Sequence, residues 1–382
     1  MEGVLALELL IAIQITNSIE EINMRIEIVT RNLKAGGAER VISQLINYWS
    51  NHGIECYLVL IEKDEHFYPI SSNIYVEEIG VRSKHRFINK ILCYLEVRRI
   101  TKKINPSVVL SLPEEIGIYV ILSLLFTPIP VVVSERNNPW LMPYKKSTRL
   151  LRKLMYPFAK GIIFQTEKAA SFFPERIKKK GKVLPNPVDL SRFSINEREI
   201  DCNNYNIISA GRLEKQKNFQ LLIDAFIIVN REFPESTLTI YGDGIERKNL
   251  ESQIENNRLS SVVFMPGRTN KLIEKMREAR LFVMSSDYEG VPNVLIEALI
   301  TGLPCVSTDC EPGGAASIIN DSENGFLVPI GDAEELAKKI ICVLSDKEIE
   351  KKFILNASKA RQKYDINRVG PLWLDYLKKL ER

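Results

Sequence analysis

The most constraining feature of the sequence is an alternation of short apolar runs with helical stretches, which occurs twice along the chain. Strands that alternate with helices of about ten to fifteen residues indicate a parallel sheet. Nearly continuous runs of Val, Ile and Leu are typical of strands that are covered on both faces. The predicted strands are 25–30, 54–62, 107–112, 129–135 and 160–166 in the first series, and 207–210, 236–242, 262–267, 279–286 and 303–309 in the second.

A break in this pattern separates the two series. Residues 185–206 are rich in Pro, Asn and Asp and lack periodicity, which is typical of a domain boundary. The sequence therefore predicts an α/β protein with two doubly wound parallel sheets that face each other across a cleft, where ligands bind at the carboxyl ends of the strands. The expected parts are a first domain at 24–190, a linker at 191–204, a second domain at 205–365 and a C-terminal helix at 366–382 that packs back on the first domain.

The first 23 residues do not fit either domain. A mostly apolar run from Val4 to Ile15 is interrupted by Glu8 and is too short to span a bilayer. It also lacks the positively charged start of a signal peptide, because the first basic residue is Arg25. Two interpretations stay open: translation begins at Met24, or residues 1–23 form a short amphipathic extension that touches a membrane.

Charge is distributed unevenly between the two halves. Residues 24–182 hold 26 Lys and Arg against 14 Asp and Glu, whereas residues 201–382 hold 24 against 27. This asymmetry indicates that the first half meets an anionic partner. Nucleic acid is not expected, because the basic half lacks an RNA-binding aromatic signature. The six cysteines form no Cys-x-x-Cys pair, so we expect no zinc site and a reducing, cytoplasmic location.

Two loops of the first domain carry polar or glycine-rich sequences after a predicted strand. Gly36 and Gly37 precede a helix, whose free N–H groups are offered to an anion, although a plain tight turn is the alternative. No G-x-G-x-x-G motif occurs there, so a dinucleotide cofactor is not indicated. The second loop contains Glu135, Arg136 and Asn137, which suit sugar hydroxyls or a phosphate; a surface ion pair with turn residues is the alternative.

The second domain opens with the loop AGRLEKQKN at 210–218. Gly211 permits close approach of a ligand, and Arg212 and Lys217 supply two cations beside a helix start. Such a pair suits a diphosphate leaving group, on which negative charge grows as its bond breaks. The alternative is two solvated surface cations. A further strand-end loop contains Gly267 and Arg268, and its backbone could border a nucleobase.

The most specific stretch is SSDYEGVPNVLIEAL at 285–299. Glu289 and Gly290 lie in a predicted loop, and a helix that begins near Pro292 carries Glu297. Eight residues along one helix would separate the carboxylates by about 12 Å, more than the roughly 5–9.5 Å of a glycosidase pair. They are better interpreted as two separate acceptors for hydroxyl groups, with free N–H groups near Asn293 and Val294 between them. Together with the two cations, they describe a nucleotide-sugar site.

In these motifs the chain resembles the retaining glycosyltransferases of family 4, which have the GT-B architecture of two facing Rossmann-like domains. The resemblance extends from Met24 to about Leu377. It rests on motifs that match in order and spacing: GGAER, SERNNP, NPVD, GRLEKQKN and EGVPNVLIEAL.

The resemblance implies a role for each matching residue. It implies that Arg212 and Lys217 bind the donor diphosphate, that Glu289 contacts the transferred sugar and that Glu297 accepts the ribose hydroxyls. The remaining donor-side residues are Gly211, Gly267, Arg268, Gly290, Asn293 and Val294. On the acceptor side it implies Gly36 and Gly37. Several family members also place a His there, but none of the three histidines follows the strand that ends near Glu135, so Glu135, Arg136 or Asn137 is expected to fill that role.

The function implied is retaining transfer of a hexose or N-acetylhexosamine from a UDP-sugar, without metal or cofactor, in bacterial surface polysaccharide assembly. The expected acceptor is a polyprenyl-diphosphate-linked saccharide. Basic segments at 82–103, 145–160 and 176–182 would dock the enzyme on the anionic inner face of the cell membrane, with ordinary solvated helix faces as the alternative. Other classes left open are a sugar-nucleotide epimerase, a phosphorylase and a non-catalytic nucleotide-sugar-binding partner.

Overall fold

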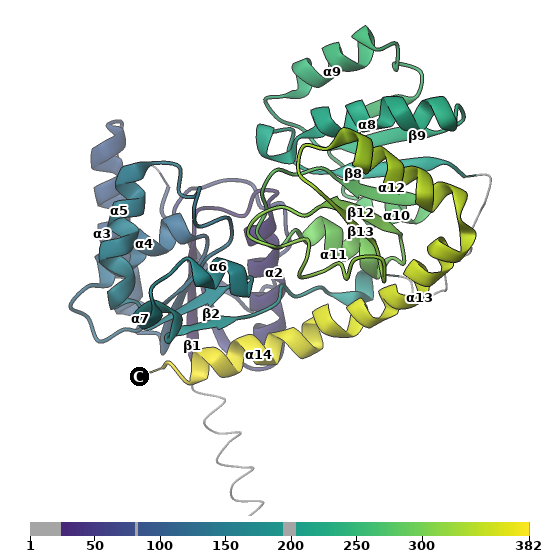
Figure 1. Ribbon diagram of the computed structural model, residues 1–382. Coiled ribbons are helices and arrows are strands. Elements are labelled where there is room, and N and C mark those ends of the chain that lie inside the picture. Colours follow the sequence, from purple (N-terminus) through teal and green to yellow (C-terminus); the bar gives the residue numbers. More distant parts are fainter. Residues whose placement is uncertain (1–23, 81–82, 194–203, 382) are drawn as a thin grey trace, which may run out of the picture. The chain divides into compact units, whose positions relative to one another are not determined.

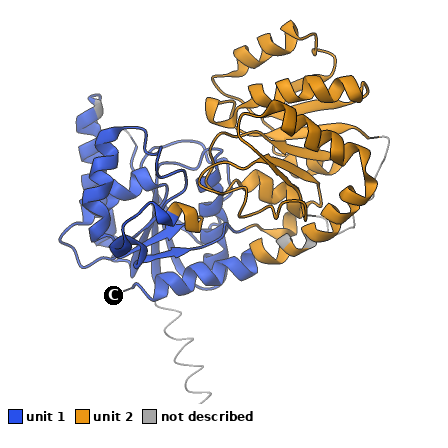
Figure 2. Ribbon diagram, viewed as in Figure 1, with its two compact units in different colours: residues 1–164, 170–187, 366–382 blue, residues 165–169, 188–365 orange. Residues whose placement is uncertain are grey.

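The computed structural model describes residues 24–80, 83–193 and 204–381 (Figure 1). The chain divides into two compact units, which Figure 2 distinguishes by colour. Unit 1 comprises residues 1–164, 170–187 and 366–382, and unit 2 comprises residues 165–169 and 188–365. The expected extension at 1–23 and most of the expected linker at 191–204 lie outside the described residues.

Unit 1 is built on a parallel sheet. Within its described part the sheet has seven strands in the order β3-β2-β1-β4-β5-β6-β7. Every pairing is parallel. The strands are β1 (Arg25–Thr30), β2 (Glu55–Leu60), β3 (Tyr75–Glu78), β4 (Val108–Ser111), β5 (Val131–Ser134), β6 (Gly161–Phe164) and β7 (Gly181–Val183).

Helices cover both faces of this sheet, because alternate strand residues point to opposite sides. Ile26 and Ile28 of β1 share a core with α2 (Gly37–Asn51) and α14 (Ile366–Lys378), whereas Val29 belongs to the core on the other face. That second core contains residues of α3 (Arg86–Ile104) and α4 (Glu114–Leu124) and of the 3₁₀ turn η1 (Tyr156–Phe158). The remaining helices of this region are α5 (Lys146–Met155), α6 (Glu167–Ser171) and α7 (Glu175–Lys178), of which α6 begins in unit 2.

The C-terminal helix α14 is part of unit 1 and runs beside α2 (Figure 1). Trp49 of α2 donates its indole N–H to the Gly370 carbonyl at 3.0 Å. Gly370 lies against the Tyr48 ring, and an added Cβ there would come within 2.4 Å of Tyr48 Cδ1. Trp373 donates to the Pro185 carbonyl at 2.9 Å. Two buried tryptophans with bonded indole groups therefore attach the chain end to unit 1.

Unit 2 repeats the architecture with another parallel sheet. Its described strands have the order β10-β9-β8-β11-β12-β13. They are β8 (Asn206–Ala210), β9 (Thr237–Tyr241), β10 (Val263–Gly267), β11 (Leu281–Met284), β12 (Cys305–Thr308) and β13 (Phe326–Val328). The helices are α8 (Phe219–Glu232), α9 (Arg247–Asn256), α10 (Leu272–Glu278), α11 (Asn293–Ile300), α12 (Ala333–Ser345) and α13 (Lys347–Tyr364). Two parallel α/β units confirm the predicted fold class.

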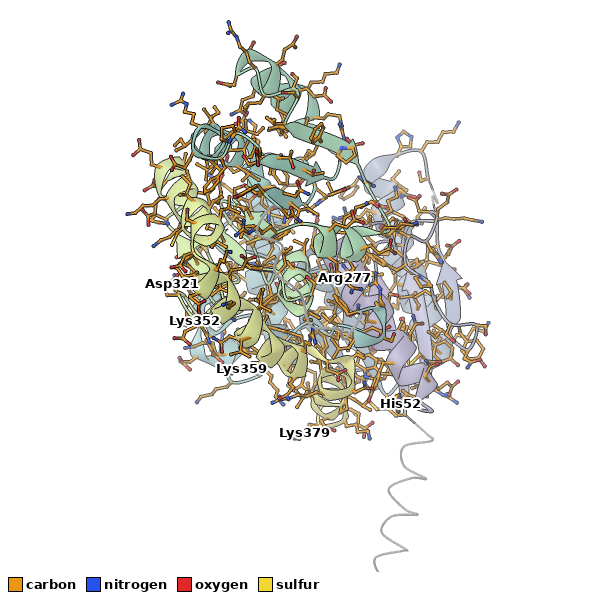
Figure 3. All side chains as sticks on the ribbon, turned by 90° about the vertical axis from the view of Figure 1, so that its right-hand side faces the viewer. His52, Arg277, Asp321, Lys352, Lys359 and Lys379 are labelled. Carbon is orange, nitrogen blue, oxygen red and sulfur yellow. The ribbon has the colours of Figure 1, made fainter. Side chains whose placement is uncertain are left out.

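Helix α13 of unit 2 has a capped start, buried residues and exposed lysines. Asp346 caps its start by accepting from the Glu348 and Ile349 amides. Phe353 on this helix is buried, whereas the labelled Lys352 and Lys359 project outward (Figure 3). Glu350, also on α13, is buried with Arg280 at 3.0 Å, so the start of α13 is attached to the residue that precedes β11.

Two short segments depart from the expected domain division. Residues 188–190 were expected within the first domain at 24–190, but they group with unit 2, where Val188 donates to the Tyr364 carbonyl at 2.7 Å. Residues 165–169 were also expected in the first domain and group with unit 2. The physical reason is local bonding: Gln165 and Thr166 hydrogen-bond to Val291 and Pro312, and both partners belong to unit 2.

Candidate active site

The candidate site in unit 2 lies on the loops that follow β8 and β11. These strands are neighbours in the sheet and parallel, so their loops leave the same edge side by side. Three hydrogen bonds tie the loops together: Ser285 Oγ donates to the Lys217 carbonyl at 3.0 Å, the Asp287 amide to the Gln216 carbonyl at 2.9 Å, and Asn218 Nδ2 to Asp287 Oδ1 at 2.7 Å. Asn218 also caps α8 by accepting from the Leu221 amide.

Lys217 and Glu289 form a buried ion pair between these two loops. Their Nζ and Oε1 atoms lie 2.5 Å apart, and the side chains are only 15% and 11% exposed. Ser286 Oγ donates to the same carboxylate oxygen at 3.1 Å. A buried pair of this kind is retained only with good geometry and additional hydrogen bonds, since both ions lose their hydration. The loops therefore hold a cation and a carboxylate in direct contact.

Glycines make room for this arrangement at the end of β8. An added Cβ at Gly211 would lie 3.1 Å from Lys217 Cε, so the lysine stem runs across the bare backbone. Gly242 follows β9 with φ +145°, and a Cβ there would come within 1.8 Å of the Gly211 carbonyl oxygen. Gly267, at the end of β10, has φ +94° and accepts the Gly242 amide at 2.9 Å. Three neighbouring strand ends therefore pack backbone to backbone.

The two cations predicted together occupy different environments. Lys217 is in the buried pair, whereas the Arg212 side chain is 58% exposed and lies 3.2 Å from Glu214. Arg268 is also exposed, directly after Gly267. The β8 loop therefore offers one fixed cation and one cation that is free to reorient toward a ligand.

Helix α11 begins as the sequence predicts. Pro292 is its N-cap, and Asn293 and Val294 are half-buried in its first turn. Glu297 lies one turn further along α11 and is 1% exposed, whereas Glu289 lies in the preceding loop. The carboxylates thus come from different elements, as the sequence reasoning expected.

A second glycine contact fixes the loop that carries Glu289 and Gly290. A Cβ on Gly314 would lie 1.5 Å from the Gly290 carbonyl oxygen, so the 309–314 loop after β12 presses directly on this backbone. The Glu289 amide donates to the Glu311 carbonyl at 2.9 Å. Nearby, burial and the Glu289 charge raise the pKa of Cys310 to about 12, so its thiol stays protonated at neutral pH.

Sequence reasoning missed two polar residues in this region. Gln165 Oε1 accepts the Val291 amide at 3.0 Å, and Thr166 Oγ1 donates to the Pro312 carbonyl at 2.8 Å. Both directly follow β6, at its carboxyl end. The strand predicted at 160–166 included both residues, whereas β6 ends at Phe164, so they were not recognised as part of a strand-end loop.

The expected acceptor-side residues lie in unit 1. Gly36 is the extended N-cap of α2, and Gly37 is the first residue of that helix. Arg136 Nη2 donates to Asn186 Oδ1 at 2.9 Å, and its amide donates to Glu114 Oε2 at 3.2 Å. Burial lowers the pKa of the Arg136 guanidinium to about 10, which leaves it charged at neutral pH.

Glu135 has a different environment from its neighbours in the same loop. It is 1% exposed, receives a hydrogen bond from Tyr156 and lies 3.5 Å from Arg152. Burial raises the pKa of Glu135 to about 7. Asn137 is half-buried and accepts the Asn138 amide at 2.8 Å. Glu135 therefore holds the loop in the core, and the half-buried Arg136 and Asn137 are the more accessible of the three.

The described part of the chain holds neither a metal-binding cluster nor a membrane-spanning helix. Across residues 24–80, 83–193 and 204–381, no group of three or more His, Cys, Asp and Glu is arranged to hold a metal ion. In the same ranges, no helix combines the length and the apolar character needed to cross a bilayer.

Comparison with known families matches the two halves of the chain separately. A model described as "Glycosyltransferase Family 4" matches residues 35–192, and a model described as "Glycosyl transferases group 1" matches residues 191–360. Together the two matches run without a gap from the start of α2 to the last turns of α13.

Named bacterial relatives resemble the chain over nearly its full length. A GalNAc-alpha-(1->4)-GalNAc-alpha-(1->3)-diNAcBac-PP-undecaprenol alpha-1,4-N-acetyl-D-galactosaminyltransferase of Campylobacter jejuni is 27% identical, over 92% of this chain and 97% of the relative. An amylovoran biosynthesis glycosyltransferase of Erwinia amylovora is 25% identical, over 90% and 96%.

Solved structures show the same fold at lower identity. HepE of Anabaena, in complex with UDP-glucose, has a TM-score of 0.78 at 18% identity, over 94% of this chain and 100% of that chain. Sucrose-phosphate synthase of Thermosynechococcus elongatus has a TM-score of 0.81 at 16% identity, over 94% and 99%.

Proposed function

Because the chain belongs to the family 4 glycosyltransferases, which have the GT-B fold, we propose that it transfers a hexose or N-acetylhexosamine from a UDP-sugar to a lipid-linked saccharide, with retention of configuration and without metal. The observation that carries the donor half of this proposal is the buried Lys217–Glu289 pair, held by loops at the carboxyl ends of two neighbouring parallel strands. Ligands of doubly wound sheets bind at such strand ends.

In the donor site, each part of a UDP-sugar is matched by residues that suit its chemistry. Lys217 Nζ supplies a fixed cation for the diphosphate, and the exposed Arg212 adds a planar fork that can turn toward a second phosphate oxygen. Glu289 accepts hydroxyl groups of the transferred sugar, and Glu297 accepts those of the ribose. Gly267 and Arg268 border the base, while Gly290, Asn293 and Val294 contribute contacts to sugar and phosphate.

The chemical step uses the leaving diphosphate as the base. The bond between the anomeric carbon and the β-phosphate oxygen breaks, and the acceptor oxygen forms its bond to the same face of that carbon. The acceptor hydroxyl proton moves to the departing phosphate. Lys217 and Arg212 stabilise the negative charge that grows on that phosphate, which lowers the barrier without a metal ion.

A lipid-linked acceptor is supported by the named relatives. The Campylobacter enzyme is named for a saccharide on undecaprenyl diphosphate, and the Erwinia enzyme for biosynthesis of amylovoran. In unit 1 we assign the acceptor to the loops with Gly36, Gly37, Arg136 and Asn137, where Arg136 remains charged.

The exposed side chains of α3 and α5 in unit 1 support docking on an anionic membrane. On α3, Phe87, Ile91 and Leu95 recur every fourth residue and are all exposed, which makes one apolar stripe. The same helix ends with the exposed Lys102 and Lys103. Helix α5 repeats the combination, with exposed Leu150 and Leu154 among its lysines and arginines. Cations near an anionic surface contribute about 1 kcal/mol each.

The transfer assay combines a UDP-sugar, a short saccharide on a polyprenyl diphosphate and an excess of EDTA. The proposal predicts an elongated lipid-linked product with the anomeric configuration of the donor, at a rate that EDTA leaves unchanged. An inverted linkage, or loss of activity with EDTA that Mg²⁺ or Mn²⁺ restores, would contradict the mechanism. Release or isomerisation of the sugar at the same rate without acceptor would indicate a different enzyme class.

Membrane docking has its own test. Liposome flotation should show binding to vesicles with 30% anionic lipid and none to neutral vesicles, and replacing Phe87, Ile91 and Leu95 by Ser should abolish the binding. Equal recovery with both kinds of vesicle would rule out this surface as an anionic-lipid contact.

A further inference from the structure

Three residues of the short segment that follows β6 contact two loops of the donor site in unit 2. We name residues 165–168 the clasp segment. Gln165 Oε1 accepts the Val291 amide at 3.0 Å, in the loop that carries Glu289. Thr166 Oγ1 donates to the Pro312 carbonyl at 2.8 Å, and Lys168 Nζ lies 2.6 Å from Glu311 Oε1. The clasp segment therefore bonds both to the 289–291 loop and to the 311–314 loop.

These two loops also bond to each other. The Glu289 amide donates to the Glu311 carbonyl at 2.9 Å, and Gly314 lies directly against the Gly290 carbonyl. The clasp segment connects the two loops a second time, because it makes one hydrogen bond to each of them. A shift of either loop would therefore break at least one bond to the clasp or to the other loop.

The three contacts of the clasp segment differ in burial, and therefore in how strongly they hold the two loops. Gln165 and Thr166 are 6% and 5% exposed, whereas the Lys168 and Glu311 side chains are about half exposed. Removing the Gln165 acceptor deletes a hydrogen bond between buried groups, which is a larger loss than the same change in solvent. The exposed Lys168–Glu311 ion pair contributes little, because water screens it. Thr166 additionally accepts the Ala169 amide at 3.0 Å, which fixes the start of α6.

We propose that Gln165 and Thr166 are positioning residues for the donor sugar. They hold the Glu289–Gly290 loop at the place where the transferred sugar binds, and they leave the binding of the UDP part largely unaffected. The second half of this statement rests on connectivity: the β8 loop with Arg212 is held by its own hydrogen bonds to residues 285–288. The inference rests on the proposed donor site.

The test compares binding of UDP with turnover of UDP-sugars in matched variants of the full chain. Gln165→Met removes the acceptor at nearly constant volume, and Thr166→Val removes the hydroxyl, while Thr166→Ser keeps it. Gln220→Met makes the same change at an exposed position of α8 and serves as the control. UDP affinity is measured by titration calorimetry. Turnover is measured as UDP released from UDP-N-acetylgalactosamine, UDP-N-acetylglucosamine or UDP-glucose with the polyprenyl acceptor.

We expect Gln165→Met and Thr166→Val each to lower kcat/KM for the UDP-sugar about tenfold, as the loss of one buried hydrogen bond implies. The Kd for UDP should stay within about twofold, and Thr166→Ser and Gln220→Met should behave as the wild type. Unchanged kcat/KM in both variants, or an equal loss of UDP affinity, would overturn the inference. A wild-type protein that binds no UDP and uses none of the three donors would instead contradict the proposed function, and this inference with it.

Discussion

Lys217 and Glu289 stabilise each other in the free protein, and the proposed donor site uses both side chains. Each is largely buried, and the carboxylate has one further hydrogen bond, from Ser286. Removing one partner of a buried pair leaves the other as an uncompensated charge, which costs about 3–5 kcal/mol. Replacing both by apolar groups is commonly neutral for stability. Stability and activity can therefore be separated at this pair.

The single variant Lys217→Met should lower the free energy of unfolding by about 3 kcal/mol and reduce transfer more than a hundredfold. The double variant Lys217→Met with Glu289→Leu should regain most of the stability but none of the activity. Urea unfolding and initial rates of transfer measure the two effects. Recovery of activity in the double variant would contradict the assignment of these residues to the donor.

Arg212 differs from Lys217, because its side chain is exposed and pairs with Glu214 at the surface. Arg212→Ala should change the free energy of unfolding by less than about 1 kcal/mol and weaken UDP binding about tenfold through loss of a phosphate contact. Arg231→Ala, at an exposed position of α8, is the matched control. The same UDP affinity in both variants would remove Arg212 from the donor site.

At the scale of elements, the strand ends carry the site, and glycine backbones set their spacing. Gly314→Ala would place a Cβ 1.5 Å from the Gly290 carbonyl oxygen, and neither backbone can yield without moving the Glu289 loop. We expect this variant to lower both the unfolding temperature and the transfer rate. The exposed Ala316, two residues later, is the control, and Ala316→Ser should have wild-type values. Full activity in Gly314→Ala would show that the 309–314 loop does not fix the site.

The sequence predicted the central elements well and the edges poorly. The run at 25–30 coincides with β1, and the other nine predicted strands each contain the observed strand in part or whole. Strands β3, β7 and β13 were not predicted. They are edge strands of three or four residues, and β3 (YVEE) is largely exposed, so none has the long apolar run that identifies a buried strand.

For the site residues, the sequence predicted positions in strand-end loops but not which side chains pair with each other. Arg212, Lys217 and Glu289 lie in strand-end loops, where the alternation of strands and helices places ligands. The direct pairing of Lys217 with Glu289 could not be predicted, because it depends on the order of β8 and β11 in the sheet. Gln165 was missed for a similar reason: its partner Val291 is 126 residues away, and only the folded chain brings the two together.

At the scale of the whole molecule, a buried carboxyl group in unit 1 makes stability depend on pH. Glu27 lies on β1 inside the sheet and accepts one hydrogen bond from Thr101 at 2.7 Å. Burial raises its pKa from 4.5 to about 7. A pKa that is raised in the folded state contributes stability in full below pH 4.5, and this contribution is lost as the pH rises through about 7.

Glu27→Gln removes this titration. Relative to the wild type, it should gain about 2–3 kcal/mol of unfolding free energy between pH 5 and pH 8. Urea unfolding at both pH values gives the comparison. Glu77→Gln, at an exposed position of β3, should keep the wild-type pH dependence. Equal slopes for Glu27→Gln and the wild type would show that Glu27 is not protonated in the folded protein near neutral pH.

Thermal unfolding with a panel of UDP-, GDP- and ADP-sugars tests whether unit 2 binds a nucleotide sugar at the Lys217–Glu289 pair. A ligand at about 100 times its Kd stabilises the folded state by about 2.7 kcal/mol, which is readily measured. The proposed donor site predicts that UDP-sugars raise the unfolding temperature of the wild type and not that of the variant with Lys217→Met and Glu289→Leu. Equal stabilisation of both proteins, or no response to any UDP-sugar, would contradict it.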